Sequence, residues 1–466
     1  MALLVGCIAN DFTGATDLAS MLVRGGVKTI QTIGVPTQAL PLGDVQAVVI
    51  ALKSRTLPAR EAVQQSLHAL QWLRAQGCEQ FYFKYCSTFD STAQGNIGPV
   101  TDALLEALDS RFTIACPAFP ENRRCVFNGY LFANDVPLNE SGMQDHPLTP
   151  MKDANLLRVL QAQTRHSVGL LDYRALHGGV ERAQARLQAL QRQGVGIAVC
   201  DTLDDQDLLT LGSLCSALPL VTAGSGLAKG LAAAWQASGR LNASTDAAAL
   251  RPAQGRRVIL SGSCSRATLS QLEQAKARYP ALRLDAEALM QRGDVVVAEA
   301  LDWCRRQDLD ATLLIYASSP AHELQRIQMH YGAEQSGARI ESALARIAQQ
   351  LVTTQGFGQL LVAGGETSGA VVEALQIEGL HIGPSIDPGV PWTQALDQRQ
   401  LPLSLALKSG NFGSDDFMLK AWELLPRPTK TACARTSRTL AAPCTNAVSV
   451  RALRATSAHA STTAGC

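Results

Sequence analysis

The chain has 466 residues, 46% of them hydrophobic, and carries 41 Lys and Arg against 40 Asp and Glu. This length and composition allow a large buried core and predict a soluble globular protein of two domains. The balanced charge provides no basic field for nucleic acid or anionic lipid, which excludes those partners and favours a small molecule.

The first residues, MALLVGCIANDF, lack the basic segment of a signal peptide and become polar at Asn10, too early for a membrane span. Twelve cysteines are scattered along the chain, with no C-x-x-C pair and no histidine spacing typical of zinc sites. We therefore expect most of them to be small core residues and the protein to be a cytoplasmic enzyme. Whether it forms a homo-oligomer is left open by the sequence.

Short apolar runs alternate with longer helical patterns in the first half of the chain. They predict strands at residues 2–8, 47–52, 81–85, 112–118, 195–200 and 218–224, with helices such as 59–76 and 179–193 between them. Strands separated by helices are typical of a mainly parallel α/β sheet. Residues 1–236 are thus predicted to form one α/β domain.

A second α/β domain is predicted for residues 257–426. Residues 237–256 are small and polar with little periodicity, which is typical of a linker. Beyond them the pattern predicts strands at 257–263, 311–318 and 359–365, and helices at 267–279, 338–353 and 368–375. We expect two α/β domains with mainly parallel sheets that face each other across a substrate cleft.

The last forty residues differ in composition from the rest. Residues 427–466 contain six Lys and Arg and no Asp or Glu, so that residues 1–426 carry 35 basic against 40 acidic side chains. The segment shows neither helical nor strand periodicity. We expect this tail to be disordered or of non-native sequence, as a frameshift would produce.

Candidate catalytic groups follow the first predicted strand. Residues 9–17, ANDFTGATD, place Asp11, Thr13 and Asp17 at a strand end, where parallel α/β sheets bind ligands. One of these residues can cap the next helix, but a cap needs only one side chain. The surplus polarity favours catalytic or substrate-binding roles for all three residues.

A second polar stretch, FKYCSTFDSTAQGNIG (83–98), begins with Lys84 at a strand end. A solvated loop also has this composition, but a cation beside hydroxyls suits a polyhydroxylated acid. The segment 119–151 is too long for a simple connector, and its adjacent arginines, Arg123 and Arg124, suit binding of a carboxylate or phosphate. The predicted catalytic cation is Lys84, and the predicted substrate-binding residues are Thr13, Asp90, Ser91, Thr92, Asn96, Arg123 and Arg124.

Three loops of small residues fall in the second predicted domain, namely 261–265 (SGSCS), 363–367 (AGGET) and 408–413 (KSGNFG). Each alone is a common glycine turn, but three in one domain suit a polyphosphate held by backbone amides and hydroxyls. The predicted nucleotide-binding residues are Ser261, Ser263, Ser265, Gly364, Gly365, Glu366, Thr367 and Gly410.

A polyphosphate in one domain and a polar acid in the other predict phosphoryl transfer. In that reaction the protein aligns the phosphate, neutralises its charge with Mg²⁺ and cations, and orients a hydroxyl beside a carboxylate. We expect Asp11 to take or orient the proton of the attacking hydroxyl, with Asp17 or Thr13 holding the substrate. Mg²⁺ is inferred from this chemistry, since the sequence predicts no dedicated metal-ligand cluster.

Five ordered motifs make the chain similar to the four-carbon acid sugar kinase family, most closely its 3-oxo-tetronate 4-kinase branch. They are IANDFTGATDLAS, KYCSTFDSTAQGNIGPVTDAL, the NRR to HPLTPM loop, SGSCS and AGGETSGAV, and the likeness runs from about residue 3 to about residue 425. The resemblance implies ATP-dependent phosphorylation of the terminal 4-hydroxyl of a sugar acid held by the N-terminal domain. It also implies that ATP contacts Ser263 or Ser265, the loop 364–367, and Gly410 of the C-terminal domain.

The chain departs from this family at one site position. The family usually has two consecutive aspartates where this chain has Asn10 and Asp11. If the first carboxylate were the base or a metal anchor, activity here would fall. Because Asp11 is retained, we predict that the second carboxylate is the base.

Other functions fit parts of the pattern. An oxidoreductase would require G-x-G-x-x-G after the first strand, where this chain has a lone Gly14. A non-enzymatic sugar-acid sensor would not require the three small-residue loops. An erythronate or threonate 4-kinase of the same family is the alternative for the substrate.

Overall fold

The computed structural model describes residues 3–146, 148–319, 321–396 and 402–426. The prediction made for residues 427–466 therefore lies outside the described residues. Helices and strands alternate along most of the described chain, and most strand pairs are parallel, which confirms the predicted α/β class. Within the described ranges, no helix combines the length and the apolar character needed to cross a bilayer.

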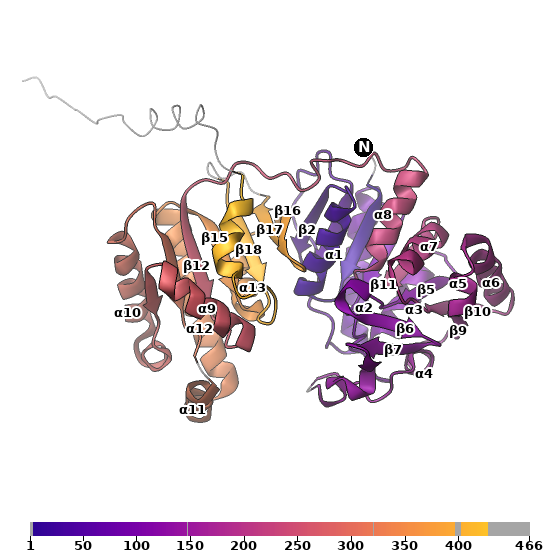
Figure 1. Ribbon diagram of the computed structural model, residues 1–466, viewed down its shortest axis with the longest axis horizontal. Coiled ribbons are helices and arrows are strands. Elements are labelled where there is room, and N and C mark those ends of the chain that lie inside the picture. Colours follow the sequence, from indigo (N-terminus) through magenta and orange to yellow (C-terminus); the bar gives the residue numbers. More distant parts are fainter. Residues whose placement is uncertain (1–2, 147, 320, 397–401, 427–466) are drawn as a thin grey trace, which may run out of the picture. The chain divides into compact units, whose positions relative to one another are not determined.

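Parallel strands form the N-terminal part of the sheet (Figure 1). They are β1 (Val5–Ala9), β2 (Thr29–Ile33), β3 (Ala47–Ala51), β4 (Phe81–Lys84), β5 (Thr113–Cys116), β9 (Ser167–Leu171), β10 (Val195–Cys200) and β11 (Leu220–Ala223). Their order across the sheet is β2-β3-β1-β4-β11-β5-β10-β9. The β1 strand therefore has β3 and β4 as parallel neighbours, which brings three carboxyl ends to one edge.

The C-terminal part of the sheet mixes parallel and antiparallel pairs. Its strands are β12 (Arg256–Ser261), β13 (Ala281–Arg283), β14 (Thr312–Tyr316), β15 (Phe357–Ala363), β16 (Gly379–Asp387), β17 (Val390–Ala395) and β18 (Ser404–Lys408). The order β13-β14-β12-β15-β18 is parallel, whereas β17 and β16 are antiparallel additions.

The two halves of the chain share one sheet, because β16 pairs with β2 through Leu380 and Gln31. The sequence did not predict this junction. Residues 379–395 contain Pro384, Pro388 and Pro391, and prolines argue against a strand because they cannot donate to a ladder. The register shifts between Ile382 and Asp387 show how β16 accommodates its irregular part.

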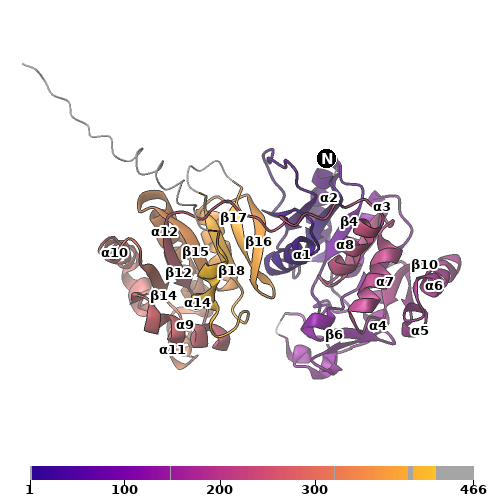
Figure 2. The ribbon, with the colours of Figure 1, turned by 45° about the horizontal axis from the view of Figure 1, so that its top comes forward.

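Helices cover both faces of the sheet (Figure 2). In the N-terminal half they are α1 (Phe12–Arg24), α2 (Ala59–Ala75), α3 (Ile97–Ala107), α4 (Leu156–Gln161), α5 (Tyr173–Leu176), α6 (Val180–Arg192), α7 (Asp205–Cys215) and α8 (Leu227–Ala237). In the C-terminal half they are α9 (Arg266–Arg278), α10 (Ala286–Arg305), α11 (Ala321–Tyr331), α12 (Ala333–Thr354), α13 (Gly365–Ala374) and α14 (Phe417–Lys420).

Strand β12 shows how alternation builds two core layers. Val258 and Leu260 join the buried cluster formed with α10, α12 and α13, whereas Ile259 joins the cluster formed with α9 and α14. This is the period of two that strands impose on side chains. An apolar run such as VIL is therefore buried on both faces, as parallel sheets covered by helices require.

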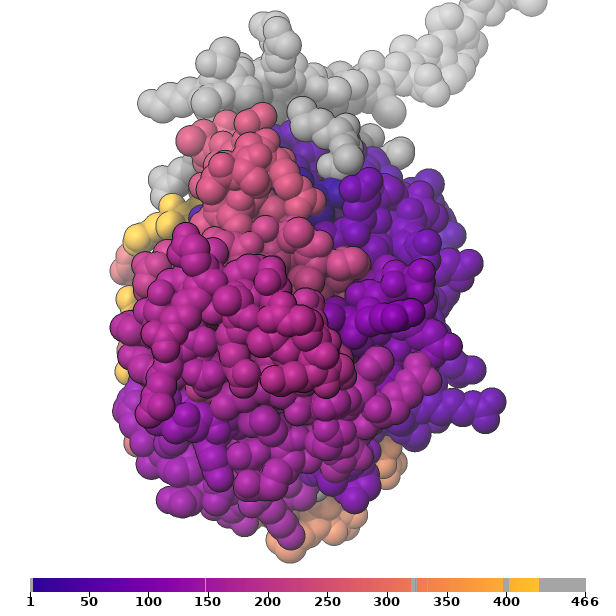
Figure 3. Space-filling view, turned by 90° about the vertical axis from the view of Figure 1, so that its right-hand side faces the viewer, coloured from indigo at the N-terminus to yellow at the C-terminus, as the bar shows by residue number. Residues whose placement is uncertain are grey.

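A small antiparallel sheet interrupts the N-terminal half. It consists of β6 (Arg124–Phe127), β7 (Tyr130–Ala133) and β8 (Val136–Pro137), all within the long loop predicted at 119–151. Figure 3 turns the N-terminal half toward the viewer, where the visible surface is built mainly by segments between α2 and α8. The predicted linker, 237–256, spans the stretch between the end of α8 and the start of β12.

Candidate active site

Asp11 stands at the carboxyl end of β1 and caps α1. Its Oδ2 accepts a hydrogen bond of 3.1 Å from the Gly14 backbone N–H. Its Oδ1 lies 2.5 Å from Nη2 of Arg55, which follows the neighbouring strand β3. A Cβ at position 14 would clash with Asp11 Oδ1 and lie 2.9 Å from Lys84 Nζ, so a larger residue there would displace both groups from these positions.

Arg55 links the ends of three neighbouring strands. Its Nη1 lies 3.3 Å from Oδ2 of Asp90, in the loop that follows β4. Asn96 holds the Arg55 loop in place, because its Nδ2 donates to the carbonyl oxygens of Ser54, Arg55 and Leu57 at 2.8, 3.2 and 3.0 Å. Asp11, Arg55 and Asp90 therefore form a chain of charges at the edge where ligands of parallel sheets bind.

Arg55 is missing from the residues predicted from the sequence. A signal for it was present, since AVVIAL (47–52) is predicted as a strand and KSR follows directly. The same strand-end reasoning that selects Asp11 and Lys84 applies to Arg55. The polar run after this strand is short, from Lys53 to Thr56, and contains no glycine or acidic residue, unlike the stretches at 9–17 and 83–98.

The loop that carries Asp90 has an unusual backbone. Phe89 and Asp90 have φ values of 64° and 47°, a left-handed conformation that side chains adopt rarely. The Asp90 carboxylate accepts a hydrogen bond of 2.6 Å from Thr88 Oγ1, and Phe89 is buried. Strain of this kind is typical of functional loops, where the surrounding contacts maintain it.

Lys84 and Asp17 lie beneath this edge, and neither is among the residues that line the cavity above it, which is described below. Lys84 is buried, and its Nζ donates to the Tyr85 carbonyl oxygen at 2.8 Å. Asp17 accepts a hydrogen bond from Ser225. Burial raises the pKa of Asp17, although nearby Lys84 and the Ser225 hydrogen bond act in the opposite direction.

The remaining predicted substrate-binding residues fall into two groups. Ser91 Oγ donates to Gln163 at 3.2 Å and Thr92 Oγ1 donates to Gln94 at 3.4 Å, so both hydroxyls have partners inside their own region. Arg123 forms an exposed ion pair with Asp135, and Arg124 donates to the Asn122 and Asn134 oxygens. The recorded partners of Arg123 and Arg124 thus belong to the small sheet and its loops, and none belongs to the Asp11 cluster.

A cavity of about 1150 Å³ opens above the Asp11 cluster. From the N-terminal half it is lined by Asp11, Thr13, Lys53 and Arg55, among others, and from the C-terminal half by residues that include Gly365, Glu366 and Gly369. The candidate acid-binding groups and the predicted nucleotide loop therefore share one space.

The three small-residue loops of the C-terminal half begin side by side. Ser261, Ala363 and Lys408, the last residues of β12, β15 and β18, are paired in register across the sheet. A Cβ at Gly410 would lie 2.7 Å from Ser263 Oγ, and one at Gly364 would lie 3.3 Å from the Ser263 backbone nitrogen. The loops therefore meet closely around Ser263.

Ser265 and Lys408 fix the third loop. Ser265 caps α9 and donates to the Gly410 carbonyl oxygen at 2.5 Å. The buried Lys408 ammonium donates to Thr268 Oγ1 and to the carbonyl oxygens of Ser409, Gly410 and Phe412, at 2.9 to 3.1 Å. Burial lowers the pKa of Lys408 to about 8. The prediction from the sequence placed Lys408 in this loop and named Gly410 as nucleotide-binding, but it did not predict that Lys408 positions Gly410.

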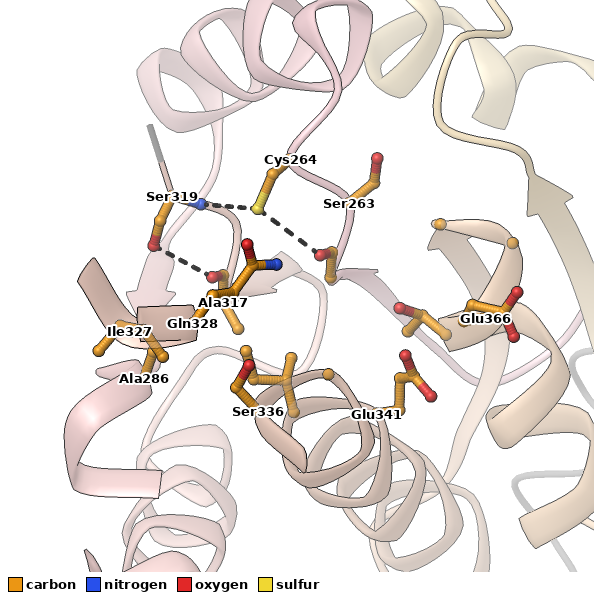
Figure 4. A pocket seen from close by; sticks show the side chains of 16 residues that line it. Ser263, Cys264, Ala286, Ala317, Ser319, Ile327, Gln328, Ser336, Glu341 and Glu366 are labelled. Carbon is orange, nitrogen blue, oxygen red and sulfur yellow. Dashed lines mark hydrogen bonds between the residues drawn. The ribbon is translucent and has the colours of Figure 1, made fainter. Parts of the chain in front are cut away.

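A second cavity, of about 290 Å³, lies in front of the first two loops. Ser263 and the run from Gly364 to Thr367 line one side of it. Figure 4 shows the apolar side chains of Ala286 and Ile327 at the end opposite Glu366. Ser261 does not line this cavity, because it is buried and its hydroxyl lies 2.9 Å from that of Ser318.

Two carboxylates flank the polar part of this cavity. Burial and the nearby Glu366 raise the pKa of Glu341, and Lys53 lowers it. Gly365 and Glu366 also line the larger cavity, so the two spaces meet at the first turn of α13. The smaller cavity thus has a polar end and an apolar end, and at its polar end it meets the larger cavity that Asp11 lines.

Family models match both halves of the chain. A sugar-binding N-terminal domain matches residues 5–231, and a nucleotide-binding C-terminal domain matches residues 258–418. A crystal structure from Salmonella typhimurium LT2, provisionally named a tRNA synthase, is 45% identical and covers 90% of this chain and 98% of its own, with a TM-score of 0.83.

Two relatives named 3-oxo-tetronate kinase are more similar in sequence to this chain than the protein of that crystal structure. The 3-oxo-tetronate kinase of Pseudomonas fluorescens is 56% identical over 420 residues, which cover 90% of this chain and 96% of the relative. That of Pseudomonas savastanoi pv. phaseolicola is 55% identical over 424 residues, with 91% and 97% covered. By this similarity along nearly the whole length of its relatives, the chain belongs to the 3-oxo-tetronate kinase family.

Proposed function

We propose that the protein transfers the γ-phosphoryl group of ATP to the terminal 4-hydroxyl of 3-oxo-tetronate. The observation that carries this proposal is the shared cavity, in which Asp11 and Arg55 face the first turn of α13. Relatives named for this reaction support the choice of substrate, and the nucleotide-binding family model supports ATP.

The acid is held by the charges at the ends of β1, β3 and β4. Arg55 offers a planar guanidinium that suits a carboxylate, because two N–H groups can bind two oxygens. Asp11 uses one oxygen for Gly14 N–H and the other for Arg55, and each carboxylate oxygen has a further lone pair for a substrate hydroxyl. Thr13 lines the same cavity and can bind a second hydroxyl.

The triphosphate is held mainly by the backbone. The first turn of α13 offers free N–H groups and the positive end of the helix dipole, and Gly364 and Gly365 let phosphate oxygens approach it. Ser263 adds a hydroxyl from the neighbouring loop. The apolar end of the smaller cavity, with Ala286 and Ile327, suits the adenine ring.

Mg²⁺ fits the residues of the smaller cavity. No group of three or more His, Cys, Asp or Glu suited to a metal occurs among the described residues, but Mg²⁺ bound with ATP commonly uses only one or two carboxylates plus phosphates. Glu341 and Glu366 line the cavity, and burial together with the nearby Glu366 raises the pKa of Glu341. A bound cation would offset the repulsion between the two carboxylates. The ion would supply charge neutralisation for the phosphates.

The side chains of the protein position the acid and accept the proton of its hydroxyl. Arg55 holds the acid so that its terminal hydroxyl points along the cavity toward α13. Asp11 accepts a hydrogen bond from that hydroxyl and takes its proton as the oxygen bonds to phosphorus. Because phosphoryl transfer needs little covalent help from the protein, alignment across the shared cavity provides most of the catalysis.

The test is an assay of purified protein with Mg-ATP and 3-oxo-tetronate, erythronate or threonate, in which ADP release and the phosphorylated product are both measured. The proposal expects ADP and a 4-phosphate ester with 3-oxo-tetronate at the highest kcat/KM. Faster turnover of another tetronate would overturn the choice of substrate. Binding of an acid without ADP release would favour a sensor.

A further inference from the structure

Lys53 reaches from the N-terminal half to the nucleotide loop. It lies two residues beyond β3, lines the larger cavity and is exposed. A Cβ at Gly369 would lie 4.0 Å from Lys53 Nζ, which places the ammonium beside α13. Gly369 is one helical turn beyond Gly365, a rise of about 6 Å that the flexible lysine side chain can cover.

The Lys53 ammonium is free for a ligand. Among the described residues it has no hydrogen-bond or ion-pair partner, although it acts on Glu341 electrostatically. Its neighbour Arg55, in contrast, is engaged by Asp11 and Asp90. Of the two cations that follow β3, Arg55 is held by ion pairs, whereas Lys53 can move toward a ligand without breaking one.

The charge of the two cavities is unbalanced for a triphosphate. Among the described residues that line them, the cations are Lys53 and Arg55, and the acids are Asp11, Glu341, Glu366, Glu373 and Glu378. A triphosphate adds further negative charge, and phosphoryl transfer requires that charge to be neutralised. Lys53 is the unpaired cation on the side from which the acceptor hydroxyl attacks.

We propose that Lys53 is a further catalytic residue, whose ammonium contacts the γ-phosphoryl group while it moves from ADP to the acid. This inference rests on the proposed kinase function. In the step, the bond from phosphorus to the bridging oxygen of ADP breaks and a bond to the 4-oxygen of the acid forms. The hydroxyl proton goes to Asp11, and Lys53 keeps its own protons throughout.

Because Lys53 comes from the acid-binding half, it also links the two substrates. A cation that contacts phosphate only in the transition state raises kcat without changing the affinity for either substrate. This behaviour distinguishes it from Arg55, whose loss should weaken binding of the acid. It also distinguishes Lys53 from a residue that only supports the fold, because its side chain is exposed and unpaired.

The experiment compares Lys53→Met, Lys53→Arg and Lys152→Met in the full chain. Lys152 is an exposed lysine of the same half that lines neither cavity. We expect Lys53→Met to lower kcat about 100-fold, as loss of a transition-state charge partner does, with both KM values changed less than about threefold. Lys53→Arg should recover at least about a tenth of wild-type kcat, and Lys152→Met should match the wild type.

Unchanged kcat in Lys53→Met would overturn the inference, and so would a loss that appears only as a raised KM for the acid. Equal losses in Lys53→Met and Lys53→Arg would also contradict a role based on charge. Circular dichroism of each variant checks the fold. If the wild type itself releases no ADP with any tetronate, the proposed function fails, and this result is distinct from failure of the Lys53 assignment.

Discussion

The two halves of the chain bring polar groups to strand ends in different ways. After β1, β3 and β4 the N-terminal half uses charged side chains, and Asp11, Arg55 and Asp90 hold one another in place. After β12 and β15 the C-terminal half uses glycines, hydroxyls and backbone groups. A small acid needs charges that recognise its carboxylate and hydroxyls, whereas a triphosphate can be met by a helix N-terminus.

This difference sets the expected size of mutational effects. In the N-terminal half each charged side chain has its own role, either in binding the acid or in the proton transfer. Loss of one such side chain should therefore change kcat or the KM of the acid strongly. In the C-terminal half several backbone groups share the phosphates, so a single change should weaken ATP binding moderately. Measurements that reverse this order would break the comparison.

Asp11→Asn should have the largest effect. The amide keeps the size of the side chain and can still cap α1, but it cannot accept the hydroxyl proton. We expect kcat to fall about 10³-fold with the affinity for ATP unchanged, measured by steady-state kinetics and by binding of a nucleotide analogue. Asp153→Asn, which removes an exposed ion pair with Arg158, is the matched control. A kcat near that of the wild type would remove Asp11 from the role of base.

Arg55→Met should have the largest effect on the KM of the acid, and it separates two candidate binding sites for the carboxylate of the acid. Loss of charge-assisted hydrogen bonds of about 1.5–3 kcal/mol predicts a rise of roughly 10- to 100-fold in the KM of the acid. The prediction from the sequence instead named Arg123 and Arg124. If Arg123→Met raises this KM and Arg55→Met does not, the small sheet rather than the β3 loop holds the acid.

The α/β class and nine of the eighteen strands in the described residues could be predicted from the sequence, because the apolar runs of these strands are short and separated by helical patterns. The strand β10, for example, spans Val195–Cys200 as predicted. The junction between β2 and β16 could not be predicted in this way. The β2 segment TIQTI has three polar residues, Thr29, Gln31 and Thr32, that are buried in the sheet, and β16 contains a proline. Neither segment therefore has the apolar pattern of a parallel strand covered on both faces.

The sequence could predict some residues that line the candidate site, but it could not predict which polar side chains point into the cavities. Asp11 and the loop from Gly364 to Thr367 line the cavities, and their positions after strands were visible in the sequence. Whether a polar side chain at a strand end points into a cavity depends on its partner. Ser261 forms a hydrogen bond with Ser318, and Asn96 donates one to the carbonyl oxygen of Ser54 in the Arg55 loop. Both partners are distant in the sequence, so the sequence pattern does not reveal these bonds.

Gly365→Val tests the C-terminal half. No atom lies within 4 Å of a Cβ built at Gly365, so the side chain would extend into the space that both cavities share without disturbing the core. We expect the KM for ATP to rise roughly tenfold, about 1.4 kcal/mol, with little change in the affinity for the acid. Gly293→Val is the control, because it also meets no atom within 4 Å and lines neither cavity. Normal ATP affinity in Gly365→Val would contradict the assignment of this loop.

The smallest effect should come from pH acting on Lys408. Because burial lowers its pKa to about 8, the side chain loses a proton as pH rises through 8, and a neutral amine offers two N–H groups to four oxygens. We expect the Gly410 loop to loosen and the KM for ATP to rise roughly threefold between pH 7 and 9.5, as loss of about one hydrogen bond would cause.

The fold should become more stable over the same pH range in which ATP binding becomes weaker. Between pH 8 and about 10.4 the unfolded chain binds more protons at this lysine than the folded chain, so the contribution of Lys408 to the free energy of unfolding rises with pH. In Lys408→Met the KM for ATP should be raised at every pH and should not vary with it. A wild-type KM that is constant from pH 7 to 9.5 would show that the protonation of Lys408 does not control the loop, and the backbone of the C-terminal half would then be rigid without it.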